Sequence, residues 1–357
     1  MTNSNGLQTK KEGGALLDPE LLSDEIAEFE EKLKNKVIGQ DRAIRNVVNA
    51  YKVCLAGLTA PGKPINNLLF LGPTGSGKTR IVEAAAEILF GSPTAFLKID
   101  CAEFQHSHEI AKLIGSPPGY IGHKETPPIF TETRLSSFHT EKLKMTFVLF
   151  DEIEKAHASV WQLLLSVLDK ATLTLGDNSP VDFSRCIIFM TSNLGGKNIV
   201  NLVSGDQIGF APHKAITEIT DPDVDSKIYR VALEAAKHEF PSEFMNRIDR
   251  IVVFRTLTHE HLREILDIEI NNVQERILAS KPEQMFVITV TNEAKEFLLR
   301  EGTDFKYGAR HLKRAIERHL IYPLSNLVTT KQIESGDTIK IGFDSKKNKL
   351  NFKKEKK

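Results

Sequence analysis

Through the first two thirds of the chain, short apolar runs alternate with longer segments in which apolar residues recur at helical spacing. The runs at 68–71, 145–150 and 186–191 are almost uninterrupted, which is typical of strands buried on both faces of a sheet. Residues 94–100 add a strand that ends in an acid, and helical spacing follows the first run at 80–90. Strands that alternate with helices predict the α/β class, with a parallel sheet and helices on both of its faces.

Other elements are predicted around these strands. The charged, amphipathic stretch from about 19 to 36 is typical of a helix, and a second helix extends to about Leu58. A helix with Trp161 on its apolar side follows the second buried run. Residues 173–183 have the pattern of a hairpin that turns at 176–178.

The pattern changes near Phe254, where a mostly helical unit begins. An apolar stripe from Leu262 to Ile277 predicts a long helix. It is followed by a strand at 285–290, helices at 292–301 and from 308 to about 327, and a closing strand at 338–343. We therefore expect a disordered segment at 1–17, a large subdomain at 18–255, a small carboxy-terminal subdomain at 256–345 and a basic, solvated tail at 346–357.

Composition narrows the class of protein. The 357 residues include 47 basic and 47 acidic side chains, so neutrality gives no general reason to expect nucleic acid as a partner. No apolar run is long enough to cross a bilayer, and the amino terminus lacks a secretory pattern. The cysteines, Cys54, Cys101 and Cys186, are odd in number and widely spaced. They favour a reducing, cytoplasmic location without a disulfide framework.

A glycine-rich stretch lies between the first buried run and the helix after it. It consists of Gly72, Pro73, Thr74, Gly75, Ser76, Gly77, Lys78 and Thr79. Strand, glycine loop and helix are the context of a phosphate-binding loop, in which backbone N–H groups face a polyphosphate. Lys78 can reach the β- and γ-phosphates, the Thr79 hydroxyl can ligate Mg²⁺, and Arg80 completes the predicted nucleotide-binding set. A glycine turn that merely starts a helix is disfavoured by the full spacing.

Acids and an amide end two of the other predicted strands. Asp151 and Glu152 follow the run at 145–150, and Asn193 follows the run at 186–191. Asp151 can hold the Mg²⁺ shell, and Glu152 can act as general base toward a water. Asn193 can orient that water. The alternatives are an acidic helix start for the two carboxylates and a helix cap for the amide.

Two arginines are candidates for charge at the γ-phosphate, which phosphoryl transfer needs and which a neighbouring molecule often supplies. Arg247 lies in Phe-Pro-Ser-Glu-Phe-Met-Asn-Arg-Ile-Asp, and Arg310 lies in Tyr-Gly-Ala-Arg-His-Leu-Lys. Each of them, taken alone, is more typical of a surface ion pair.

Taken together, these motifs resemble those of the AAA+ ATPases, and within them the second, carboxy-terminal ATPase ring of the Clp unfoldases and disaggregases. The resemblance covers about 37 to 343 and includes Val-Ile-Gly-Gln at 37–40, Gly-Ser-Pro-Pro-Gly-Tyr-Ile-Gly at 115–122, Phe-Asp-Glu-Ile-Glu-Lys-Ala-His at 150–157, Thr-Ser-Asn-Leu-Gly at 191–195, Glu-Phe-Met-Asn-Arg-Ile-Asp at 243–249 and Tyr-Gly-Ala-Arg at 307–310. The chain looks like a free-standing second ring.

The resemblance implies a role for individual residues. Val37 and Ile38 are expected beside the adenine of ATP or ADP, and Asn193 is expected to act as sensor 1. Arg247 is expected to act on the nucleotide of a neighbouring subunit, and Arg310 as sensor 2 on its own nucleotide. The resemblance also implies a homohexameric ring, in which an active site is completed between subunits.

A second loop is expected to contact the substrate. By resemblance, Gly119, Tyr120, Ile121 and Gly122 line a central pore that grips extended polypeptide, so unfolded or aggregated proteins are the expected substrates. An aromatic side chain offers apolar area without sequence preference, and the glycines allow the loop to move.

Three functions follow from these features. The chain is expected to be an ATP-driven protein unfoldase or remodelling chaperone. The alternative is a regulatory ATPase subunit of a Clp-type peptidase, favoured by Ile208, Gly209 and Phe210, which resemble a peptidase-docking tripeptide. A DNA-remodelling role is disfavoured by the neutral charge and by the Gly-Tyr-Ile-Gly loop.

Overall fold

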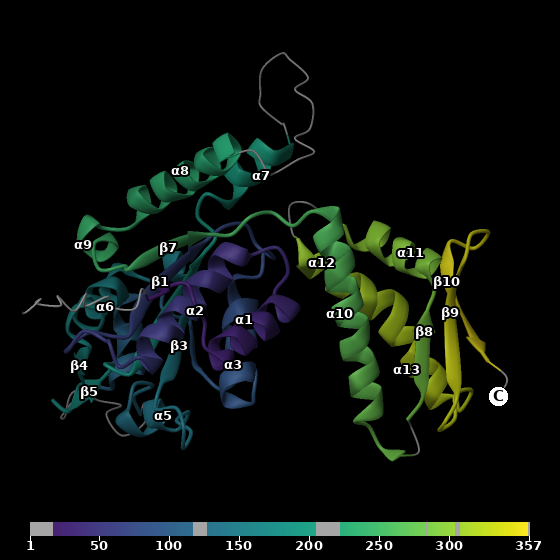
Figure 1. Cartoon of the computed structure of the whole chain (residues 1–357), viewed down its shortest axis with the longest axis horizontal. Helices are drawn as coiled ribbons and strands as arrows, with labels where there is room; N and C mark the ends of the chain where they lie inside the picture. The colour runs from purple at the N-terminus through teal and green to yellow at the C-terminus, as the bar shows by residue number, and fades with distance from the viewer. Residues whose placement is uncertain (1–16, 117–126, 205–221, 283–284, 304–307, 356–357) are drawn as a thin grey trace, which may run out of the picture.

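The computed structural model describes residues 17–116, 127–204, 222–282, 285–303 and 308–355. These residues form a large α/β subdomain and a small, mostly helical one, which lie beside each other in Figure 1. The chain passes between the two where the last strand of the large sheet leads into a long helix. No helix in these ranges is long and apolar enough to span a membrane.

A parallel sheet of five strands forms the centre of the large subdomain. Its spatial order is β2-β3-β6-β1-β7, and every pairing between neighbours is parallel. The strands are β1 (Asn66–Leu71), β2 (Leu97–Asp100), β3 (Thr146–Asp151), β6 (Cys186–Ser192) and β7 (Arg250–Val253). Because parallel strands end at one edge, the phosphate loop, Asp151 and Asn193 are brought to the same side of the sheet.

Helices cover both faces of this sheet, which explains its nearly continuous apolar runs. Along β1, Leu68 and Phe70 join a core with α1 (Asp24–Lys36), α2 (Asp41–Leu55) and α3 (Lys78–Phe90). Leu69 and Leu71 join the core on the other face. That face is covered mainly by α4 (Ala111–Ile114), α5 (Glu132–Ser136), α6 (Ala158–Lys170), α7 (Gly196–Ser204), α8 (Pro222–Glu239) and α9 (Ser242–Met245). The predicted α/β class is thereby confirmed.

Shorter elements complete the large subdomain. The predicted hairpin is present as β4 (Thr172–Thr174) and β5 (Pro180–Asp182), paired antiparallel. In the described part of this subdomain, turns of 3₁₀ helix occur at η1 (Cys101–Glu103), η2 (Ser107–Ile110) and η3 (Ile153–Lys155). The third of them follows Asp151 and Glu152 directly and therefore shapes the site described below.

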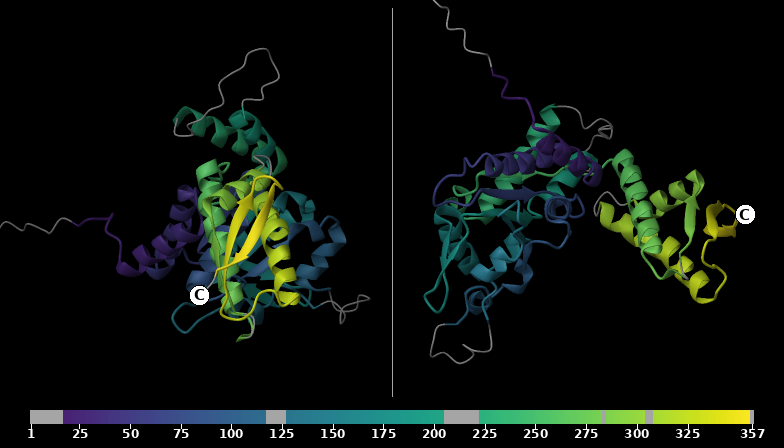
Figure 2. Two further views of the ribbon diagram at one scale, coloured as in Figure 1. Left: turned by 90° about the vertical axis from the view of Figure 1, so that its right-hand side faces the viewer. Right: turned by 60° about the horizontal axis from the view of Figure 1, so that its bottom comes forward.

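The small subdomain packs helices against a second sheet of three strands. Its helices are α10 (His259–Leu278), α11 (Asn292–Gly302), α12 (Ala309–Ile316), a π-helical turn η5 (Glu317–Ile321) and α13 (Tyr322–Thr329). Strand β9 (Thr338–Asp344) lies between β8 (Val287–Val290) and β10 (Lys349–Lys354). Figures 1 and 2 show β8 to β10 on the side away from the large subdomain and α12 on the side toward it.

The lysine-rich end departs from the sequence prediction. Residues 346–357 were expected to be a solvated tail, but β10 pairs antiparallel with β9 from Lys349 to Lys354. Leu350 and Phe352 alternate with polar residues and pack on the core of the small subdomain. The charge of the flanking lysines hid this alternation. Strand β7 was also missed, although Ile251, Val252 and Val253 are β-branched residues typical of strands.

Candidate nucleotide-binding site

The phosphate loop connects β1 to α3 and forms the floor of a cavity of about 280 Å³. Gly77 caps α3 with φ +100°, a conformation that favours glycine, and a Cβ built there would meet nothing within 4 Å. The loop backbone is therefore uncrowded at this position. Of the predicted loop residues, those that line the cavity are Thr74, Gly75, Ser76, Gly77, Lys78, Thr79 and Arg80.

Lys78 is buried at the start of α3. Its ammonium group donates to the carbonyl oxygens of Gly72 and Pro73, at 2.8 and 2.9 Å, and to Asn193 Oδ1 at 2.9 Å. Burial lowers the pKa of Lys78 to about 8, against the opposing effect of nearby carboxylates. The loop thus holds an ammonium group whose positive charge is only partly compensated. An anionic phosphate would compensate the rest.

Asp151, at the end of β3, gathers hydroxyl groups on one oxygen. Its Oδ1 accepts from Thr191 at 2.6 Å and from Thr79 at 3.1 Å, while Oδ2 pairs with Lys98 at 2.8 Å. Burial raises the pKa of Asp151, but the contacts with Lys98 and the threonines outweigh it and hold that pKa below its ordinary value. A carboxylate beside a threonine hydroxyl is the oxygen donor set that suits Mg²⁺, so these residues fit the predicted ion.

Glu152 follows with φ +58°, a left-handed conformation that is uncommon for a residue with a side chain. Its N–H donates to Thr191 Oγ1 at 3.0 Å, which stabilises the turn. Its carboxylate accepts from Asn193 Nδ2 at 3.0 Å and pairs with Lys155. The unusual backbone places the second acid at the cavity, where Asp151 and Glu152 both line the wall.

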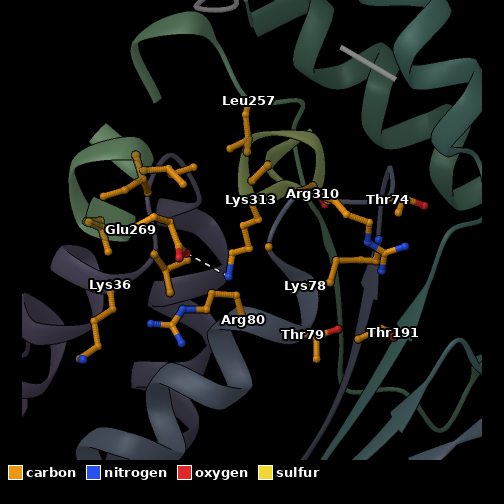
Figure 3. Close-up of a pocket in the computed structure, with 18 of the residues that line it drawn as sticks. Lys36, Thr74, Lys78, Thr79, Arg80, Thr191, Leu257, Glu269, Arg310 and Lys313 are labelled. Carbon is orange, nitrogen blue, oxygen red and sulfur yellow. Dashed lines mark ion pairs between the residues drawn. The ribbon is translucent and has the colours of Figure 1, made fainter. Parts of the chain in front are cut away.

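The small subdomain supplies another wall of the same cavity. Arg310 lies in the first turn of α12, and Figure 3 shows its guanidinium directed toward Lys78. Lys313, one turn later, pairs with Glu269 of α10 at 3.0 Å. Gly308 has φ +53°, and a Cβ there would lie 2.7 Å from the carbonyl oxygen of Gly75. The turn before α12 therefore sits directly on the phosphate loop.

The segment before α2 closes the cavity from the amino-terminal side. Val37 and Ile38, the residues predicted to lie beside an adenine, both line it. The buried amide of Gln40 donates to the carbonyl oxygens of Ser76 and Arg255, both at 3.0 Å. Gln40 therefore connects the phosphate loop to the chain that leads into the small subdomain.

Comparison with known proteins agrees with this arrangement. Residues 63–251 match the AAA domain (Cdc48 subfamily), and residues 257–341 match the C-terminal, D2-small domain of ClpB protein. The chain belongs to the AAA domain family. The two matched ranges correspond to the parallel-sheet subdomain and to the helical small subdomain.

Relatives of this AAA chain include ClpA homologs, ClpB and ClpC, and the solved structures that resemble it include Hsp104. It is 38% identical over 319 residues to an ATP-dependent Clp protease ATP-binding subunit ClpA homolog of Porphyra purpurea, covering 88% of this chain and 36% of that protein. It is 37% identical over 318 residues to the chaperone protein ClpB of Aquifex aeolicus, covering 89% of this chain and 30% of that protein. The S. cerevisiae Hsp104:casein complex in its extended conformation matches with a TM-score of 0.76 and 28% identity. The match covers 93% of this chain and 52% of that chain. The chain thus spans about a third of the length of these two relatives.

Arg247 is a predicted site residue that the fold keeps apart from Lys78, Asp151 and Arg310. Within the described ranges, it is not among the side chains that line the cavity. It follows α9, donates to the carbonyl oxygen of Glu243 at 2.8 Å and lies 3.8 Å from Asp169. The structure of one chain therefore assembles Lys78, Asp151 and Arg310 in one place but not Arg247.

Some predicted residues of this AAA chain lie outside the described ranges, and some site residues were not predicted. Gly119, Tyr120, Ile121 and Gly122 fall in the first group, as do Ile208, Gly209 and Phe210. The unpredicted residues at the cavity include Lys36, Thr191, Glu269 and Lys313. Lys313 could have been found from its position one helical turn after Arg310, and Thr191 from its place in the motif at 191–195, whereas Glu269 carries no local signal.

Proposed function

We propose that this chain binds ATP with Mg²⁺ in the cavity between its subdomains, hydrolyses it, and uses the energy to remodel other proteins. The observation that carries the proposal is the linked arrangement of Lys78, Asn193 and Glu152. Asn193 accepts from the lysine at 2.9 Å and donates to the carboxylate at 3.0 Å. A phosphate-binding cation and a basic carboxylate are thereby held on the two ends of one amide group.

Each side chain has a distinct part in this proposed hydrolysis. The Glu152 carboxylate accepts a proton from the attacking water, and Asn193 holds that carboxylate in place. Lys78 and Arg310 provide positive charge for the phosphate oxygens. Thr79 and Asp151 would hold Mg²⁺, which neutralises phosphate charge when it is bound. Conversion of Glu152→Gln is expected to leave nucleotide binding intact and to reduce turnover strongly.

The position of Arg247 supports assembly into a ring. It lies away from the cavity of its own chain, yet its guanidinium is held in place by Glu243. An arginine fixed in this way can act on the nucleotide of the next subunit, as in other enzymes that receive an arginine from a partner. We therefore propose a homohexamer in which every site is completed by its neighbour.

The proposed substrate is extended polypeptide, gripped by Tyr120 in the ring's pore. The structural relationship to an Hsp104:casein complex supports this assignment. A Tyr120→Ala variant is expected to keep its oligomeric state and ATPase rate but to lose unfolding of a tagged model protein. Tyr322→Ala serves as the matched control, because Tyr322 is an exposed tyrosine on the small subdomain. Unfolding at the parental rate in Tyr120→Ala would remove the pore assignment and leave a nucleotide-dependent scaffold.

A second function is favoured by the names of several relatives. They are ATP-binding subunits of Clp proteases, and Ile208, Gly209 and Phe210 resemble a docking tripeptide. Co-sedimentation with a Clp-type peptidase in the presence of ATP tests this alternative. Binding that is lost in an Ile208→Ala, Phe210→Ala double variant would support it, and no binding by the parent would exclude that peptidase as a partner.

We also propose that the protein works in the cytoplasm. Cys54, Cys101 and Cys186 are all free thiols. Burial raises the pKa of each of them, so they are kept in the unreactive thiol form. Free thiols suit a reducing compartment.

A further inference from the structure

A second glutamate in the turn after β3 makes a contact that the mechanism above does not use. Glu154 lies in η3, two residues beyond Glu152. Its Oε1 accepts from the backbone N–H of Asn193 at 3.0 Å. Its Oε2 is buried and has no hydrogen-bond partner in the part of the chain that the structure describes. Burying a carboxylate oxygen without a hydrogen bond costs stability, so the place of this side chain calls for an explanation.

Glu152 and Glu154 hold Asn193 from two sides. Glu152 accepts from the side-chain amide, whereas Glu154 accepts from the backbone. The remaining side-chain atom, Oδ1, accepts from Lys78 and from Thr74 Oγ1. Because the Asn193 side chain is short, the direction of its amide group depends on the position of its own backbone. The backbone contact with Glu154 therefore sets the geometry of the other contacts.

The turn that carries Glu154 is itself firmly held. The indole N–H of Trp161 donates to the carbonyl oxygen of Ile153 at 3.0 Å. Lys155 N–H donates to the carbonyl oxygen of Glu152 at 2.9 Å, and Ile153 is fully buried. Glu154 is thus attached to a rigid support, which is what a residue needs in order to position another one.

We propose that Glu154 is a positioning residue for ATP hydrolysis, holding the backbone of Asn193 so that its amide stays between Lys78 and Glu152. This inference rests on the proposed hydrolysis. Glu154 acts through Asn193, so its loss is expected to lower kcat and to leave nucleotide affinity nearly unchanged.

Two substitutions separate the reach of the side chain from its charge. Glu154→Gln keeps an oxygen at the same reach and removes the charge, whereas Glu154→Asp keeps the charge and shortens the side chain by one methylene. We expect Glu154→Asp to lose about 10-fold to 100-fold in kcat, as small displacements of catalytic groups do. The Glu154 charge helps to keep Lys78 protonated, so the assays are run at about pH 6.5, below the Lys78 pKa. There Glu154→Gln is expected to stay within about 3-fold of the parent, and both variants to bind a fluorescent ADP analogue within about 3-fold of it.

A control variant tests for general destabilisation. Thr146 lies at the opposite end of β3, and its buried hydroxyl donates to the carbonyl oxygen of Leu135 at 2.6 Å. Thr146→Val removes this hydrogen bond far from the cavity, so it should lower Tm without a change in kcat. A kcat that falls in step with Tm in all three variants would overturn the positioning role, and so would a loss confined to Glu154→Gln.

Amide hydrogen exchange at Asn193 gives a readout that does not depend on turnover. The N–H of Asn193 should be protected in the parent and in Glu154→Gln and should exchange faster in Glu154→Asp. Equal protection in all of them would contradict the inference. If the parent does not hydrolyse ATP, the proposed function fails, and this exchange measurement alone decides whether Glu154 holds Asn193.

Discussion

At the scale of single residues, Lys78 makes nucleotide binding dependent on pH. Burial places its pKa at about 8, below the ordinary value of 10.5. Phosphates favour the protonated form, so affinity should be constant below pH 7.5 and fall by up to about 10-fold per unit above pH 8. Titration of ATP binding by calorimetry from pH 6.5 to 9.5 measures this directly.

The lowered pKa of Lys78 also makes folding stability depend on pH. Between pH 8 and the ordinary pKa of 10.5, the unfolded chain holds a proton on Lys78 that the folded chain has released. The cost of burying this charge therefore declines as pH rises through that window, and folding stability rises.

The control for the binding titration is a Lys78→Met variant. It lacks the titrating group and should bind ATP weakly, with an affinity that does not fall above pH 8. If the ATP affinities of variant and parent change equally with pH, Lys78 is not the titrating group.

At the scale of elements, the start of α12 is coupled to the phosphate loop. Ala309 N–H donates to the carbonyl oxygen of Gly75 at 3.3 Å, and Gly308 leaves no room for a Cβ against that oxygen. Gly308→Ala should push α12 and Arg310 away from the loop and reduce ATP turnover by about 10-fold or more. Steady-state hydrolysis assays on the purified variant check this expectation.

Gly91 provides the matched control for this substitution. It ends α3 with φ +80°, and a Cβ there would meet nothing within 4 Å. Gly91→Ala therefore also places a side chain at positive φ, at a cost of about 1–2 kcal/mol in this left-handed conformation, but without a steric contact. It should lower Tm and leave turnover unchanged. Equal ATPase rates in the Gly308 and Gly91 variants would argue against coupling through α12.

At the scale of the whole molecule, Arg247 distinguishes a ring from a self-contained monomer. Arg247→Ala should fold normally but hydrolyse ATP slowly, because each cavity loses the guanidinium of its neighbour. Mixing this variant with Lys78→Ala should restore part of the activity. Some interfaces in mixed rings then pair an intact phosphate loop with an intact arginine.

The control for this experiment is each variant measured alone at the same total concentration. Mixed assembly is verified by native mass spectrometry of differently tagged chains. Mixed rings without any regained activity would contradict a role of Arg247 between subunits. The exception is a ring in which all subunits must hydrolyse ATP together. A titration of inactive subunits into the parent ring would reveal that case.

Much of the site could be predicted because its chemistry lies in contiguous residues. The phosphate loop, Asp151 with Glu152, and Asn193 each directly follow a buried strand, and apolar runs alone predict such strands. Parallel strands place their carboxyl ends at one edge, so the meeting of these groups follows from the fold class. The predicted sheet with helices on both faces is confirmed for the same reason.

Other features depend on contacts between residues far apart in the chain, which no local pattern encodes. Folding brings Gly308 against Gly75 and Glu154 against the backbone of Asn193. It also turns the lysine-rich end into β10, because Leu350 and Phe352 gain a core to pack against that only the assembled small subdomain provides. Such pairings arise from close packing of whole elements, where burial and hydrogen bonding outweigh the preferences of short segments.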